Sequence, residues 1–176
     1  MEKSPLRYND EADRAYGLTG MAISMVVWDG ESMLSGVNLD ADPGCGLEVT
    51  PEFHFAGNPR LSARLAWHQM VKQFELSTAM LLGNAMCRSY VGQSRALTSS
   101  ATAMLRAVVR DEGRSVCSLD DDEIAHIYDK VSGYLDRLFT HHAVAGLANS
   151  FAGTLRERRR LSAAEAIEQL SALSGL

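Results

Sequence analysis

Hydrophobic and polar positions follow two different periods along this chain. Residues 21–27 and 32–39 are short β-capable runs on either side of the dipeptide Asp29-Gly30, which favours a tight hairpin turn. A third run, residues 47–55, alternates strictly between apolar and polar side chains, as expected of a strand with one buried face. We therefore predict an antiparallel β-meander of about three strands within residues 19–57, after a polar segment over residues 1–18.

From residue 58 the apolar positions recur with the period of a helix. Asn58 is a suitable cap, Pro59 suits the first helical position, and an apolar stripe continues to about residue 90. A helix over residues 59–90 would be about 48 Å long, whereas a compact chain of this size should be roughly 40 Å across. The pattern predicts either a break near Gly83-Asn84 or a projecting helix that binds a partner chain.

Further helices are expected in the C-terminal part. One segment begins near Ser94 and closes at Gly113. Asp120 and Glu123 have the spacing of a capping box, and Ser162 and Glu165 repeat that device. A break is expected near residues 140–142, between two apolar stripes. Together these signals predict a bundle of four to five helices over residues 58–176.

The order of these segments predicts the fold class. A short meander followed by helices is typical of an α+β fold with segregated halves, in a single domain over residues 1–176. Parallel β-α-β alternation is absent, as are the glycine-rich phosphate-binding motifs that accompany it. The usual nucleotide-binding folds are therefore disfavoured.

Charge and cysteine content narrow the function classes. The net charge of −5 and the lack of a concentrated basic surface disfavour a nucleic-acid partner. No apolar run approaches the roughly 18 residues that a membrane span needs. Three cysteines without a C-x-x-C motif favour reduced thiols in a cytoplasmic protein, and the polar start lacks the apolar stretch of a signal peptide.

One candidate site lies on the strand predicted at residues 47–55. Glu48, Glu52 and His54 would share one face of that strand, about 7 Å apart, and such groups can bind a divalent cation or exchange protons. A single row rarely completes a coordination sphere, so the simpler interpretation is the solvated face of an edge strand. Pro51, which cannot donate a ladder hydrogen bond, agrees with an edge position.

Three other patterns resemble metal or switch sites without completing them. Residues 40–51 begin like a calcium-binding loop but have Cys45 where glycine is required and Pro51 where glutamate is required. Glu123 and His126 have the spacing of a di-iron ligand pair, but no second pair follows. His141 and His142 would point about 100° apart on a helix and so not converge on one ion.

No catalytic template fits, and no cofactor is indicated. We therefore expect a non-catalytic interaction or assembly module that forms a homodimer through the long apolar helix or an exposed sheet edge. The competing hypothesis is an enzyme or receptor that binds a small molecule or metal in a pocket between sheet and helices. In that hypothesis the Glu48, Glu52 and His54 row, or the loop before it, lies at the mouth of the pocket.

Overall fold

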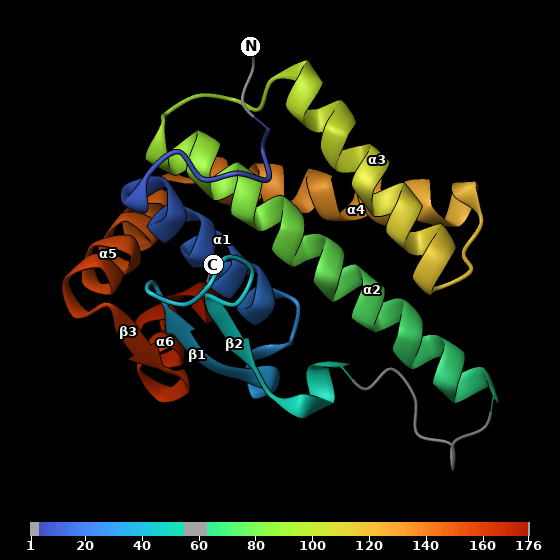
Figure 1. Cartoon of the computed structure of the whole chain (residues 1–176), viewed down its shortest axis with the longest axis horizontal. Helices are drawn as coiled ribbons and strands as arrows, with labels where there is room; N and C mark the ends of the chain where they lie inside the picture. The colour runs from blue at the N-terminus through green and yellow to red at the C-terminus, as the bar shows by residue number, and fades with distance from the viewer. Residues whose placement is uncertain (1–3, 55–62, 176) are drawn as a thin grey trace.

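A computed structural model describes residues 4–54 and 63–175 of the chain (Figure 1). Within these residues the α-helices are α1 (Glu11–Val27), α2 (Ala63–Met86), α3 (Ser99–Val116), α4 (Asp121–Thr140), α5 (His142–Arg158) and α6 (Ala163–Leu170). The strands are β1 (Leu34–Asn38), β2 (Leu47–Val49) and β3 (Arg160–Ser162). Short helical turns are η1 (Glu31–Met33), η2 (Pro51–His54), the π-helical η3 (Cys87–Gly92) and η4 (Ser171–Gly175). The predicted α+β class, with a three-stranded antiparallel sheet and a helical bundle, is confirmed.

The strand predicted at residues 21–27 is wrong, because these residues form the second half of α1. Asp10 caps this helix by accepting a hydrogen bond from the Asp13 amide. Neighbouring elements cover α1 on several sides, so Ile23 and Met25 are both fully buried. A helix without a polar face lacks the period that identifies helices in a sequence.

The Asp29-Gly30 dipeptide ends α1 instead of turning a hairpin. Asp29 has a φ of 54°, the left-handed conformation that commonly follows the last residue of a helix. Its amide donates to the Val26 carbonyl at 3.2 Å, and the Gly30 amide donates to the Met25 carbonyl at 2.8 Å. These two bonds are those of a Schellman motif.

The sheet combines strands that are far apart in the sequence. The order is β2-β1-β3, with both pairs antiparallel. Strand positions within the predicted runs 32–39 and 47–55 are confirmed, but β2 is only three residues long because Pro51 begins η2. The third strand comes from Arg160–Ser162, in the predicted helical half. The sheet packs against α1 and α6 (Figure 1).

Helix α2 is continuous from Ala63 to Met86, so the first of the two alternatives, a break near Gly83-Asn84, is wrong. The predicted cap Asn58 and first helical residue Pro59 lie outside the described residues. Helix α2 crosses α1 at close range, where a methyl group on Gly20 would overlap the carbonyl oxygen of Gly83. Its C-terminal end continues directly into η3. Its first turns extend away from the rest of the molecule (Figure 1), and none of the residues 64–73 is buried. We call residues 64–73 the α2 stem.

The C-terminal helices agree well with their sequence signals. Both capping boxes are present, Asp120 with Glu123 and Ser162 with Glu165. Helix α4 ends at Thr140, inside the predicted break. Helix α3 begins at Ser99 and not near Ser94. None of the helices in the described part of the chain is long and apolar enough to cross a membrane.

Candidate functional site

The row of Glu48, Glu52 and His54 does not form, because only Glu48 lies on a strand. Its carboxylate accepts a hydrogen bond at 2.7 Å from Nη2 of Arg160 on β3. Glu52 and His54 lie in η2, whose tight turns point them in other directions than a strand would. The prediction that these three side chains share one face of a strand, which suggested a metal or acid–base site, is therefore wrong.

The loop before β2 is fastened to the rest of the fold through its backbone and through Asp40. The Arg14 guanidinium donates to the carbonyl of Ala41, and Arg159 forms ion pairs with Asp40 and with Glu11. Within residues 4–54 and 63–175, no three His, Cys, Asp or Glu side chains are grouped so that they could hold a metal ion. The carboxylate of Asp40 is paired with the guanidinium of Arg159.

The other sequence candidates have local structural roles. Glu123 accepts a hydrogen bond from the Asp120 amide at 3.0 Å, as the capping box requires. The rings of His141 and His142 stack with centroids 4.8 Å apart at the junction of α4 and α5. Burial strongly raises the pKa of the Cys87 thiol, which disfavours the thiolate needed for nucleophilic chemistry.

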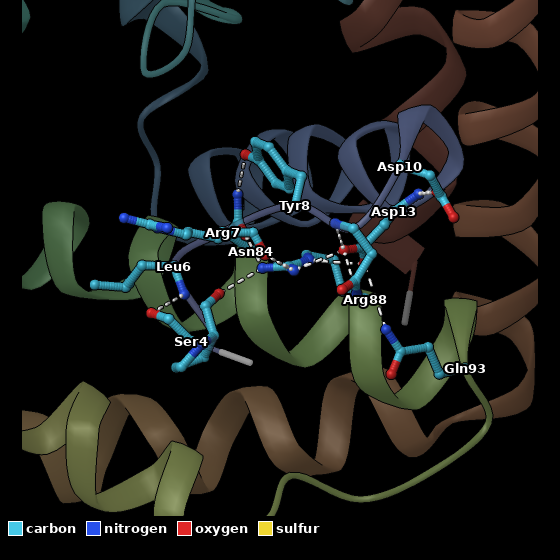
Figure 2. Close-up of polar contacts among 11 residues, drawn as sticks. Ser4, Leu6, Arg7, Tyr8, Asp10, Asp13, Asn84, Arg88 and Gln93 are labelled. Carbon is cyan, nitrogen blue, oxygen red and sulfur yellow. Dashed lines mark hydrogen bonds and ion pairs between the residues drawn. The ribbon is translucent and has the colours of Figure 1, made fainter. Parts of the chain in front are cut away.

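A buried ion pair that we did not predict joins α1 to η3 (Figure 2). Arg88 donates from Nε to Oδ1 of Asp13 at 2.8 Å and from Nη2 to Oδ2 at 2.7 Å. The two side chains are only 7% and 6% exposed. Two parallel hydrogen bonds of this kind are the strongest arrangement that an arginine and a carboxylate can adopt.

The same guanidinium holds the N-terminal segment, residues 4–9, against α1 and α2. Nη1 of Arg88 donates to the carbonyl of Pro5, and Nη2 donates to that of Arg7 at 2.6 Å. The ring of Tyr8 lies 4.9 Å from the guanidinium carbon. Figure 2 shows these contacts converging on Arg88. We call residues 4–9 the strap.

All five N–H groups of Arg88 are occupied, since Nη1 also lies 3.5 Å from Oδ1 of Asn84. Asp13 is equally well satisfied, because the backbone amide and side-chain amide of Asn9 donate to it at 2.8 and 2.9 Å. Burial raises the pKa of the Asp13 carboxyl, but hydrogen bonds and charge from Arg88, together with Asn9, lower it overall. The pair is thus suited to holding the strap and has no free donor for a ligand.

The sequence contains one signal of this pair. Arg88 is a charged residue inside the apolar stretch 79–91. A charge surrounded by apolar positions on a helix needs a buried partner or a route to solvent. The identity of the partner was not predictable, because Asp13 lies 75 positions away.

A cleft of about 560 Å³ separates the end of α1 from the first half of α2. Trp28 and Glu52 line it, so one member of the predicted row does reach a cavity. Lys130 of α4 and Glu75 of α2 also line it, and the Lys130 ammonium donates to the Glu75 carboxylate at 2.8 and 3.1 Å. The cleft therefore combines an aromatic wall with several charged groups.

The α2 stem carries apolar surface to the end of the molecule. Trp67 is 43% exposed, and it lies seven positions before the buried Phe74 on the same helical face. Gly113 of α3 approaches Phe74, and Val116, about one turn further on, is 68% exposed. We use the name end face for three neighbouring parts of the surface. These are the α2 stem, residues 112–116 at the end of α3, and Asp122 at the start of α4.

Comparisons with protein-family models, curated proteins and solved structures found no match. Function is therefore inferred from the geometry of the ion pair, the cleft and the end face.

Proposed function

We propose that this protein is a non-catalytic interaction module that forms a homodimer through its end face. The observation that carries the proposal is the apolar stripe of α2. This stripe packs into the core at Phe74 and continues outward to Trp67, where it is half-exposed. Exposed tryptophan at the centre of a patch is typical of interaction surfaces.

A second copy of the chain is the occupant that fits the charges of the end face. On the stem, Arg64 and His68 are exposed and make no ion pair with another described residue. At the adjoining corner, Glu112 of α3 and Asp122 of α4 are exposed and likewise unpaired within residues 4–54 and 63–175. A two-fold arrangement brings the basic stem of each copy to the acidic corner of the other.

The size of the stem sets the expected strength of the dimer. Ten helical residues extend about 15 Å, which is short for a permanent interface. Stable interfaces bury roughly 1,200–2,000 Å² in total, and smaller ones belong to transient complexes. We therefore expect a reversible dimer with a micromolar dissociation constant.

Sedimentation equilibrium of the whole chain over a range of concentrations tests this proposal. We expect the average mass to rise from monomer to dimer, and Trp67→Asp to abolish that rise, because a charge would be buried at the contact. Leu6→Asp is the matched control, since Leu6 is 46% exposed but lies on the strap. A monomer at every concentration, or equal effects of the two variants, would contradict the proposal.

A cytoplasmic location is part of the proposal. Its support is chemical: Cys45, Cys87 and Cys117 are all free thiols, and Cys45 is exposed. Detection of a disulfide in protein isolated from its own cells under thiol-blocking conditions would overturn it.

A further inference from the structure

The cleft between α1 and α2 has an apolar wall of defined orientation. Val27 and Trp28 at the end of α1, with Leu76 on α2, supply this wall. The Trp28 ring meets that of Tyr134 edge-on, with centroids 5.0 Å apart and planes at 85°. Such a pair fixes the indole in place. The volume of about 560 Å³ lies within the range of small-molecule sites.

Charged groups of both signs line the same cleft, and only some of them neutralise one another. Lys130 and Glu75 form an ion pair, so they cancel locally. Asp29, Glu52 and Lys72 also line the cleft, and none of the three forms an ion pair with another residue of the described chain. The surplus is therefore two carboxylates and one ammonium group.

Asp29 is an unfavourable residue for the position it occupies. Its φ of 54° is the conformation in which glycine is preferred after a helix. A carboxylate at the C-terminal end of a helix also meets the negative end of the helix dipole. Glycine would thus suit the backbone better at this position, and the carboxylate of Asp29 adds negative potential where the α1 carbonyls already supply some.

We propose that this cleft binds a zwitterionic small molecule, namely an amino acid or short peptide with an apolar side chain. Its ammonium group lies at Asp29 and Glu52, beside the end of α1. Its carboxylate lies at Lys72, and its side chain packs on Trp28. This proposal does not rest on the homodimer, although Lys72 belongs to the α2 stem as well as to the cleft.

Calorimetric titration of the whole chain with three probes tests the assignment. The probes are phenylalanine, phenethylamine, which lacks the carboxylate, and 3-phenylpropanoate, which lacks the amine. We expect phenylalanine to bind with at least about tenfold higher affinity than either partial analogue, because only the zwitterion engages both charged ends. Equal affinity for phenylalanine and phenethylamine, or no heat with any probe at millimolar concentration, would overturn the proposal.

Two variants separate binding from folding. Asp29→Gly should keep or raise the thermal midpoint, because glycine suits the backbone there, yet weaken phenylalanine binding by about tenfold. Lys72→Gln should weaken it similarly, whereas Arg137→Gln, an exposed change on α4, should leave it unchanged. Wild-type affinity in a folded Asp29→Gly protein would rule out the ammonium site.

Discussion

Arg88 and Asp13 carry opposite charges inside the protein, and neither charge is stable there alone. Removing either ion from water is costly, and the pair offsets this cost only through close geometry and additional hydrogen bonds. Asn9 supplies such bonds to Asp13, and the strap carbonyls of Pro5 and Arg7 accept them from Arg88. The pair and the strap therefore stabilise each other.

Replacement of Arg88 tests this coupling. Arg88→Met should lower the free energy of unfolding by about 3–5 kcal/mol, because it leaves the Asp13 carboxylate buried without its partner. Urea denaturation followed by circular dichroism measures the change. Arg137→Met, an exposed change on α4, should alter stability by less than about 0.5 kcal/mol. A loss below about 1 kcal/mol for Arg88→Met would show that the pair does not organise the N-terminal region.

The pH dependence of stability follows from the lowered pKa of Asp13. Its folded pKa lies below the ordinary value of 3.8, so the folded state favours the ionised carboxyl. The resulting stabilisation is complete above that value and is lost as pH falls toward the folded pKa. The difference in unfolding free energy between wild type and Asp13→Asn should therefore shrink as the pH is lowered from about 5 to below 3. A difference that stays constant across this range would contradict the prediction.

Residue chemistry in the sequence predicts part of the candidate site. The sequence predicts Glu52 as a candidate site residue, and Glu52 does line a cavity, although with Trp28 and Lys72 instead of Glu48 and His54. The grouping was wrong because Pro51 starts a tight helical turn where a strand was expected. Spacing along one segment cannot reveal partners that other elements contribute.

At the level of elements, the crossing of α1 and α2 depends on two glycines. A side chain on Gly20 would overlap the backbone of Gly83, and one on Gly83 would overlap Oγ of Ser24. A Cβ on Gly83 would also lie only 2.7 Å from the carbonyl oxygen of Gly20, so backbone atoms limit the approach at both positions. The two helices can therefore approach this closely only where both positions lack a Cβ atom.

Alanine substitutions test the close crossing. Gly20→Ala should destabilise the protein by about 3 kcal/mol, because the helices must move apart and repack. Gly146→Ala on α5 is the matched control, since its Cβ would meet nothing within 4 Å. That change should stabilise the fold by about 0.5–1 kcal/mol through helix propensity. Equal effects of the two variants in urea denaturation would refute the packing argument.

The elements that were predicted correctly have local causes. Asp120 and Ser162 each cap a helix by exchanging hydrogen bonds with a glutamate three residues further on. Both partners of the interaction are therefore close together in the sequence and can be recognised from it. Residues 21–27, the second half of α1, were predicted to be a strand because the surroundings of this helix, and not its own residues, determine which sides are buried. The dipeptide Asp29-Gly30 suits both a hairpin turn and the end of a helix, because both need a residue in the left-handed conformation. The dipeptide alone therefore could not distinguish a hairpin from a helix end.

For the molecule as a whole, the sequence predicted the class but not the assembly of the sheet. β1 pairs on one edge with β2, its neighbour in sequence, and on the other with β3. The three residues of β3 carry too little pattern to be recognised as a strand. Their pairing is specified by the packing of α5 and α6 around them.

The distribution of charge over the end face leads to a prediction about the dimer. Arg64→Glu should weaken dimerisation, because the new negative charge on the stem then faces the acidic corner of the second copy and is repelled by it. Glu112→Lys should weaken it as well, and the combined variant should recover much of the loss. Sedimentation equilibrium at low salt measures all three. Additive losses in the combined variant would show that these groups do not meet across a two-fold axis.

The pairing of β1 with β3 has a consequence for how the protein is made. Arg160 of β3 pairs with Asn38 of β1, which lies 122 positions earlier in the chain. At the pace of translation, several seconds or more separate the two strands as they leave the ribosome. During that interval β1 presents a vacant hydrogen-bonding edge, which another nascent chain can occupy. Crowded polysomes are therefore where we expect this protein to need a chaperone most.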